Sequence, residues 1–368
     1  MQFIDLKAQQ QRIRDKIETN IKKVLDHGRY VMGPEIQELE EKLAGYVGAR
    51  HAIGVASGTD ALLIPLMAYG IGPGDAVFTT PFTFIATAEV IQLLGAEPVF
   101  VDSQPDTFNI DPQELARTIE RTVKEGKLRP RGIIPVDLFG QTADYDEINE
   151  IARKYDLFVL QDAAQSFGAS YKGKKACSHG HAAATSFFPA KPLGCYGDGG
   201  MIFTDDAALH QTYISIRVHG QGRDKYSNVR IGVNGRLDTI QAAVLLAKME
   251  IFDEEIQLRQ EVAGRYKDGL QSPAVAAHVK DYNISAWAQY AILHPDRDAV
   301  MAKLNQQGIP TAIYYPTPLH LQEAFTGLGY SRGDFPVSED VADRIFSVPM
   351  HPYLSREDQD KIVEAINN

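Results

Sequence analysis

The chain has 368 residues, of which 44% are hydrophobic and 23% charged, a composition typical of a folded globular protein rather than a disordered or fibrous one. Its 37 Lys and Arg residues against 48 Asp and Glu residues give a net charge of -11, which repels phosphate backbones and argues against nucleic acid as a partner. Because it has only 2 cysteines, a polar N-terminus and no apolar run near the ~18 residues of a membrane span, we expect a cytoplasmic protein with neither a disulfide framework nor a membrane partner.

Helical and extended patterns alternate along most of the chain. Apolar residues recur at helical spacing from Leu6 to Leu25, and Gly28 follows, which predicts one amphipathic helix. Short runs of β-forming residues come next, separated mostly by segments of helical period, at 51–57, 76–82, 97–102, 132–138, 157–162, 182–188 and 200–204. This alternation predicts an α/β fold with a large, mostly parallel sheet that is covered on both faces.

The chain divides into two predicted units. A long helix from about Leu237 past Phe252 closes a large unit that we assign to residues 1–250. Residues 251–368 predict a smaller α+β C-terminal unit. Its apolar segments lie at 287–293 and 311–315. No flexible linker separates the units, so we expect them to pack together.

Three short motifs resemble known binding sites, but each lacks a feature that such a site requires. Residues 168–175 have the glycine and lysine spacing of a phosphate-binding P-loop, but a lysine stands where a Ser or Thr must hold magnesium. Residues 70–75 follow a helical segment and lack the final glycine of a dinucleotide-binding fingerprint. Cys177, His179 and His181 have alternate spacing without a clear fourth ligand, so plain loop residues are favoured over a metal site.

The ends of the predicted strands carry a more coherent set of residues. In an open parallel sheet, ligand-binding groups gather beyond the carboxyl ends of the strands. At 56–60 a strand gives way to Gly58, a capping Thr59 and a helix, which leaves free backbone N–H groups at a positive helix end. This pattern indicates a phosphate seat, with an ordinary capped turn as the alternative. Another strand ends in Phe82 and Phe84, an aromatic pair that either covers a flat ring or packs in the core.

Two charged residues complete the set. Asp162 follows the apolar run 157–160, where a buried carboxylate needs a partner such as a protonated ring nitrogen, unless it only caps a helix. Lys191 lies between aromatic and glycine-rich flanks, and Pro192 favours extended backbone there. A desolvated lysine amine can lose its proton and attack a carbonyl, although most lysines are simply solvated. A phosphate seat, an aromatic face, a carboxylate and a nucleophilic lysine are jointly what pyridoxal 5′-phosphate requires.

The chain closely resembles the DegT/DnrJ/EryC1/StrS family of pyridoxal phosphate-dependent sugar aminotransferases, whose architecture is fold type I, the aspartate aminotransferase type. The resemblance extends over essentially the full length. It rests on Phe3–Leu6, Gly28–Pro34, Ser57–Asp60, Asp162–Ser166, Ser186–Lys191, Gly197–Gly200 and Asn234–Asp238.

The resemblance implies a role for each matching residue. Lys191 would form the covalent link to the cofactor aldehyde, and Asp162 would pair with the pyridinium nitrogen. Gln165 would contact the ring hydroxyl and Phe84 the ring face. The phosphate would be held by Gly58, Thr59, Asp60 and Ser186. Asn234 would reach the phosphate in the neighbouring subunit, which implies a homodimer with shared active sites.

Within the family, the strongest likeness is to enzymes that use L-glutamate to aminate UDP-2-acetamido-2-deoxy-3-dehydro-D-glucuronate at C3 in the synthesis of bacterial surface polysaccharides such as lipopolysaccharide O-antigen. Arg29, His219 and Arg236 are candidates for binding carboxylate and diphosphate groups. Further candidate polar contacts are Tyr314, Tyr315, His320 and His351. A structural role is an equal alternative for each of these residues.

Other activities remain open within the resemblance. Relatives aminate 3- or 4-ketosugars, including 6-deoxysugars, on UDP, dTDP or GDP. A sugar dehydratase normally has His at the lysine position, so Lys191 argues against that activity. A regulatory protein that binds the cofactor without turnover is the alternative of another class.

Overall fold

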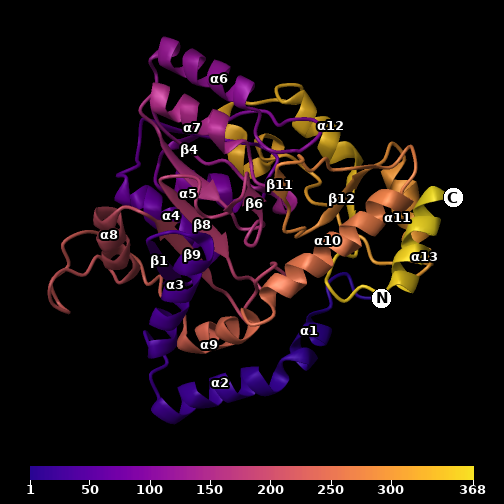
Figure 1. Ribbon diagram of the computed structural model, residues 1–368. Coiled ribbons are helices and arrows are strands. Elements are labelled where there is room, and N and C mark those ends of the chain that lie inside the picture. The colour runs from indigo at the N-terminus through magenta and orange to yellow at the C-terminus, as the bar shows by residue number, and fades with distance from the viewer.

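The computed structural model describes residues 1–368 and places a large sheet on one side and a smaller C-terminal unit on the other, joined by one long helix (Figure 1). The seven strands lie in the order β1-β9-β8-β5-β4-β2-β3, and only β9 runs antiparallel to its neighbours. In that order the strands are β1 (His51–Val55), β9 (Gly200–Thr204), β8 (Ala182–Ser186), β5 (Phe158–Asp162), β4 (Arg129–Ile133), β2 (Asp75–Thr79) and β3 (Glu97–Phe100). The predicted α/β class with a mostly parallel sheet is confirmed.

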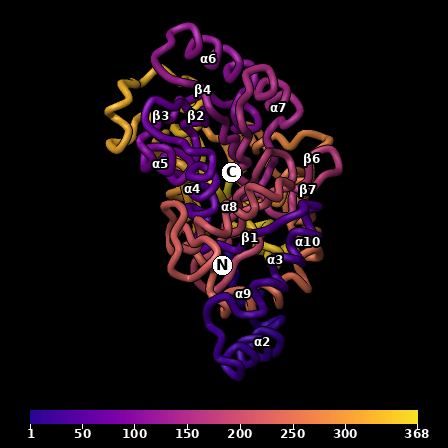
Figure 2. The backbone as a smooth tube through the Cα atoms, turned by 90° about the vertical axis from the view of Figure 1, so that its left-hand side faces the viewer, coloured from indigo at the N-terminus to yellow at the C-terminus, as the bar shows by residue number.

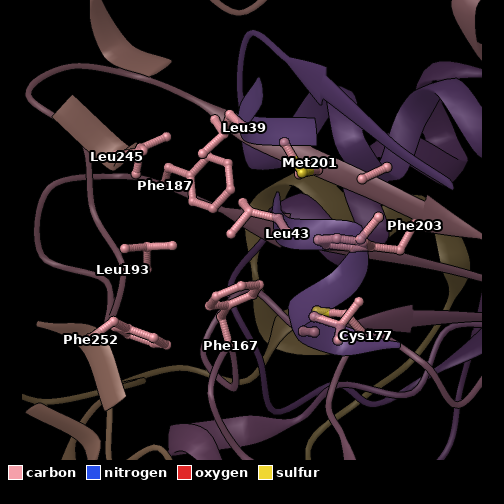
Figure 3. Close-up of a cluster of buried hydrophobic side chains, with 14 of the residues drawn as sticks. Leu39, Leu43, Phe167, Cys177, Phe187, Leu193, Met201, Phe203, Leu245 and Phe252 are labelled. Carbon is pink, nitrogen blue, oxygen red and sulfur yellow. The ribbon is translucent and has the colours of Figure 1, made fainter. Parts of the chain in front are cut away.

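Helices cover both faces of this sheet. They are α3 (Pro34–Val47), α4 (Gly58–Ala68), α5 (Ala86–Leu93), α6 (Pro112–Glu125), α7 (Tyr145–Lys154) and α8 (Ala207–Arg217). Along β9, Met201 and Phe203 join the buried cluster that contains Leu43 of α3 (Figure 3), whereas Ile202 joins the cluster that contains Ile64 of α4. Successive side chains of a strand point to opposite faces, so β9 is apolar throughout because both of its faces are buried.

The two long helices predicted from periodicity are each broken in two. The four pieces are α1 (Leu6–Arg12), α2 (Arg14–His27), α9 (Thr239–Lys248) and α10 (Phe252–Gly269). Gln9 of α1 donates to Glu255 of α10 at 2.9 Å, and Asn20 of α2 donates to the carbonyl of Ala243 in α9 at 3.2 Å. Helix α1 therefore contacts α10 and helix α2 contacts α9. The break at Ile13 between α1 and α2 thus corresponds to the break between α9 and α10. Figures 1 and 2 show α2 beside α9.

Two predicted extended segments also differ from the structure. The segment 132–138 forms a strand only up to Ile133, because Pro135 has no N–H group to continue the ladder. The chain nevertheless stays beside β5, where Val136 bridges Asp162. The segment 311–315 forms no strand, and a single bridge joins Ala312 to Ser347.

The C-terminal unit is built on a second, antiparallel sheet in the order β10-β12-β13. Its elements are β10 (Val275–Ala276), β12 (Tyr290–Leu293), α11 (Arg297–Gln306), α12 (Pro336–Arg344), β13 (Ile345–Val348) and α13 (Arg356–Asn367), with 3₁₀ turns at Leu319–Leu321 and Glu323–Leu328. A third small sheet joins β11 (Asn283–Ile284), β6 (Ser170–Tyr171) and β7 (Lys174–Lys175), and a 3₁₀ turn spans Leu138–Gly140.

The two units share buried surface. Phe82 and Phe139 from the large unit pack in one cluster with Leu293 and Ile345 from the C-terminal unit. Helix α10 begins in the core of the large unit and ends in that of the smaller one. The predicted division at residue 250 falls in the turn between α9 and α10, and it remains a prediction because α10 packs in the cores of both units. None of the helices has the length and apolar character to cross a membrane.

Candidate active site

The strand ends meet as the parallel topology requires. Ser57 follows β1, Asp162 ends β5 and Ser186 ends β8, and these three strands run in the same direction within the sheet. A Cβ atom added to Gly58 would lie 2.7 Å from the Cβ of Ser186, so the loop after β1 sits directly against the end of β8. The predicted groups of different strands thus share one edge of the sheet.

The predicted phosphate seat is the N-terminus of helix α4. The residue that caps this helix differs from the one predicted from the sequence. Ser57, not Thr59, is the N-cap of α4: its Oγ accepts a hydrogen bond from the N–H of Asp60 at 3.0 Å. Gly58 and Thr59 are the first helical residues, and their N–H groups have no acceptor within the chain. Asp60 is half-buried, and this burial raises the pKa of its carboxyl group. Two free N–H groups at the positive end of a helix suit a phosphate.

Replacement of Gly58 by alanine is expected to weaken cofactor binding by about 5- to 150-fold, because overpacking costs roughly 1–3 kcal/mol. The added methyl must displace Ser186, which flanks the same seat. Titration of the apoprotein with cofactor measures the effect. Gly45→Ala is the matched control, since nothing lies within 4 Å of the added methyl and Gly45 belongs to α3 rather than to the phosphate seat. Equal affinity in both variants would contradict the assignment of the seat.

Asp162 is held in one orientation at the end of β5. It is only 5% exposed; its Oδ2 accepts from the Thr87 hydroxyl at 2.8 Å, and its Oδ1 accepts from the N–H of Ala164 at 3.1 Å. Burial raises the pKa of Asp162, and the two hydrogen bonds and the charge of Lys191 oppose that rise. Each oxygen keeps a lone pair for a further donor. Sequence reasoning missed Thr87, whose only signal is its place in the first turn of a helix, α5, that starts just after Phe84.

Lys191 lies within electrostatic reach of Asp162. Burial lowers the pKa of the Lys191 amine, and the charge of Asp162 partly opposes this. No hydrogen bond contributes to that pKa, so the amine is free to react. A lowered pKa increases the fraction of neutral amine, which is the nucleophilic form.

Gln165 and Phe84 are both positioned by contacts with other segments. Gln165 accepts from the N–H of Phe139 at 2.8 Å and donates to the Tyr315 hydroxyl at 3.2 Å, so its amide orientation is set. The Phe84 ring is 54% exposed and lies 6.3 Å from the Tyr315 ring. This exposure argues against the core-packing alternative for Phe84 and leaves a ring face available. Through Tyr315, the C-terminal unit contacts residues that lie at the ends of the strands.

Residues 11–367 match the DegT/DnrJ/EryC1/StrS aminotransferase family. The chain belongs to this family. It is 51% identical over 369 aligned positions to the UDP-2-acetamido-2-deoxy-3-oxo-D-glucuronate aminotransferase of Pseudomonas aeruginosa, with 100% of both chains covered. A DegT DnrJ EryC1 StrS aminotransferase from Brucella abortus superposes with a TM-score of 0.97 at 53% identity, covering 100% of this chain and 98% of that one. DesV of S. venezuelae in complex with a ketimine intermediate superposes with a TM-score of 0.95 at 35% identity, covering 100% and 97%.

The protein is therefore an aminotransferase of fold type I, and its cofactor is pyridoxal 5′-phosphate. The chain's own residues fit that group. The close approach of Gly58 to Ser186 and the free N–H groups of α4 suit its phosphate. The lone pairs of Asp162 and the free amine of Lys191 suit its ring nitrogen and its aldehyde.

The other candidate contacts of this aminotransferase fall into two groups. Arg29, His219 and Asn234 are exposed, and no hydrogen bond joins them to Lys191 or Asp162 within one chain. Arg236 is partly buried and bridges Val55 at the end of β1. Tyr314 packs 6.4 Å from Phe3 of the N-terminal segment. All of these side chains stay partly accessible to a ligand.

His320 and His351 are instead buried. The His320 side chain is 0% exposed, pairs with Glu339 at 3.0 Å and packs on Phe335. His351 is 4% exposed and follows Met350, whose N–H donates to the carbonyl of Phe3. Neither imidazole is open to a substrate here, so the expected substrate contacts of these two residues lack support and a structural role is favoured. Such burial cannot be read from a histidine in a sequence.

The stability of the aminotransferase is expected to fall as the pH drops from about 6.5 to 4, in part because of His351. Burial lowers the pKa of His351 from 6.5 to about 4, so in this range the unfolded chain binds a proton that the folded chain does not. The loss reaches roughly 3 kcal/mol when the pH has fallen through the folded-state value. Denaturant unfolding measured across this range should show a flatter pH profile for His351→Phe. An unchanged slope would contradict this origin.

Two other features do not belong to the site. A cavity of about 500 Å³ lies between β3, α6 and the segment 328–335 and is lined by neither Lys191 nor Asp162. In the Cys177–His181 loop, His179 stacks 5.0 Å from the Tyr145 ring and His181 accepts the N–H of Val159 at 3.0 Å. No group of 3 or more His, Cys, Asp or Glu side chains is placed to hold a metal ion.

Proposed function

We propose that this aminotransferase transfers the amino group of L-glutamate to C3 of UDP-2-acetamido-2-deoxy-3-dehydro-D-glucuronate, in the cytoplasm, for bacterial surface-polysaccharide synthesis such as that of lipopolysaccharide O-antigen. The observation that carries the proposal is the 51% identity, over 100% of both chains, to the Pseudomonas aeruginosa enzyme of that name. Relatives with other sugar substrates are less similar, such as a dTDP-3-amino-3,6-dideoxy-alpha-D-galactopyranose transaminase at 39%.

The proposed chemistry follows from the charges and protonation of the site. When bound, pyridoxal 5′-phosphate supplies a carbonyl that carries the amino group and a ring that accepts an electron pair. The Lys191 amine holds the cofactor at rest and, once free, moves the proton of the amino acid α-carbon. The Asp162 carboxylate keeps a proton on the ring nitrogen. The first turn of α4 and Ser186 would hold the phosphate, Phe84 would contact the ring face and Gln165 the ring hydroxyl.

The acceptor carries two kinds of anionic group, a diphosphate and the C6 carboxylate. Arg29, His219 and Arg236 are the cationic candidates, and guanidinium groups bind both anions through paired hydrogen bonds. Arg236 is the strongest candidate because it lies at the end of β1, next to the phosphate seat. Tyr314 and Tyr315 supply neutral polar contacts from the C-terminal unit.

A homodimer with shared sites is part of the proposal. The loop after α8 extends away from the sheet (Figure 1) and exposes Tyr226 by 86% and Ile231 by 85%. Apolar side chains this exposed favour a covering partner. Asn234 is exposed on the same loop, which supports its proposed contact with the partner's phosphate seat.

Mixing two inactive variants tests the sharing. In a mixed dimer, Lys191→Ala and Asn234→Ala place both lesions in the same shared site, so the other site is intact. Unfolding and refolding an equal mixture should restore about a quarter of wild-type activity, as random pairing of two subunits requires. No recovery, with dimers present by light scattering, would refute shared sites.

The substrate assignment is tested spectroscopically with the holoenzyme. Glutamate should convert the visible absorption of the lysine-bound cofactor to that of its amine form and release 2-oxoglutarate, and UDP-linked 3-ketouronate should restore the original spectrum. The neutral sugar UDP-N-acetyl-3-ketoglucosamine serves as the control acceptor. Arg236→Gln should lower kcat/KM for the uronate more than for this neutral sugar. If only a dTDP- or GDP-linked 4-ketosugar restores the original spectrum, that sugar is the acceptor in place of the uronate. Loss of oxygen from the sugar would indicate a dehydratase. No response to glutamate with any ketosugar would favour the regulatory alternative.

A further inference from the structure

A second buried carboxylate, Asp137, lies beside the site in the segment that follows β4. It is 0% exposed, and its main-chain N–H donates to the Asp162 carbonyl at 3.0 Å. Its side chain accepts four hydrogen bonds. The donors are the N–H of Ala143 (3.0 Å), the Tyr145 hydroxyl (2.8 Å), the Gln161 amide (2.7 Å) and the Ser166 hydroxyl (2.6 Å).

No cation pairs with this carboxylate. Burial raises the pKa of Asp137 to about 6, and the four donors oppose that rise. Burying a carboxylate without a cation costs free energy, and the hydrogen bonds that it accepts offset part of that cost. The donors come from α7, from the loop before it, from β5 and from the turn after β5, so Asp137 joins segments that are otherwise separate.

The turn after β5 is the segment that carries the cofactor contacts. It runs from Ala163 to Ser166, and its Ala164 N–H orients the Asp162 carboxylate while its Gln165 side chain faces Tyr315. The Ser166 hydroxyl ties the far end of this turn to Asp137, and the N–H of Ser166 closes the turn on the Ala163 carbonyl at 3.1 Å. Asp137 therefore holds the turn at Ser166 and at the carbonyl of Asp162.

We propose that Asp137 is a positioning residue for the cofactor: through Ser166 and the Asp162 main chain it holds the 163–166 turn so that Asp162 and Gln165 face the ring. The inference rests on the roles proposed above for those two residues. It predicts that the hydrogen bond to Ser166 affects the cofactor, whereas the bond to Tyr145 affects only stability.

Two variants that each remove one donor to the same carboxylate separate positioning from simple packing. Ser166→Ala removes the donor on the turn, and Tyr145→Phe removes the donor on α7. Ser166→Ala should weaken cofactor binding by about tenfold, the usual effect of one lost hydrogen bond to a charged group, and should shift the pH midpoint of the holoenzyme's visible absorption. Tyr145→Phe should lower the Tm and leave both cofactor measurements at wild-type values. If Ser166→Ala does not fold, Ser166→Cys keeps a weaker donor of similar size.

The outcomes are distinct. If both variants lower the Tm alike while cofactor affinity and the spectral titration stay at wild-type values, Asp137 only supports the fold and the inference is overturned. Asp162→Asn tests the role of Asp162 on which this inference rests. An unchanged spectral titration in that variant would show that Asp162 does not have the proposed role. None of these measurements uses a sugar substrate, so an error in the acceptor would not affect them.

Discussion

Replacing Lys191 by alanine is expected to lower the rate of amination by about 10⁴-fold or more, because one amine provides both the covalent attachment and the base. Burial lowers the pKa of this amine, which increases the fraction of the neutral, nucleophilic form. The variant should still fold and still bind the cofactor through the phosphate seat and Asp162, but without the visible absorption of the lysine-bound form.

Borohydride reduction and peptide mapping test this assignment directly, since reduction fixes the cofactor to the lysine that holds it. The chain offers a demanding control in Lys248, which is only 1% exposed, whose pKa burial lowers to about 8, and whose Nζ lies 4.6 Å from the centre of the Tyr196 ring. Lys248→Met should keep the label and the activity. A label on the Lys248 peptide, or an unlabelled protein, would overturn the site described above.

Asp162→Asn is expected to cost about 10²–10³-fold in kcat, the size of effect seen when one preorganised electrostatic contact is removed from an active site. An amide cannot stabilise a proton on the ring nitrogen, so the ring accepts electrons less well. Asp162→Glu keeps the charge but moves it, and it should retain more activity than the amide variant. Activity of Asp162→Asn near the wild-type level would refute this role for the carboxylate.

Thr87→Val provides a matched variant that leaves the Asp162 carboxylate in place. The Thr87 hydroxyl lowers the pKa of Asp162, so its removal should raise that pKa and move the acid limb of the activity profile to higher pH. The protonated form of Asp162 cannot hold the ring proton, which is why activity falls on the acid side. An acid limb at the wild-type position would show that Asp162 does not set it.

Local patterns were sufficient for the chemistry of this protein. The strand that ends in Asp162, the helix start at Gly58 and the short segment before Lys191 each carry their function in neighbouring residues, and parallel strands bring such ends to one edge of a sheet. The same reasoning misplaced the cap of α4 at Thr59, because Ser57 and Thr59 are both good caps and only the backbone decides between them.

What the sequence by itself determined is the alternation of elements, the family and the cofactor; what only the tertiary structure decided is how distant segments meet. Periodicity could not predict the breaks at Ile13 and between α9 and α10, since they arise from the paths of partner helices. Nor could it predict the contacts of Thr87 and Asp137 with the site or the burial of His351. Hydrogen bonds and burial of this kind depend on residues tens to hundreds of positions away, whereas helix and strand patterns depend on near neighbours.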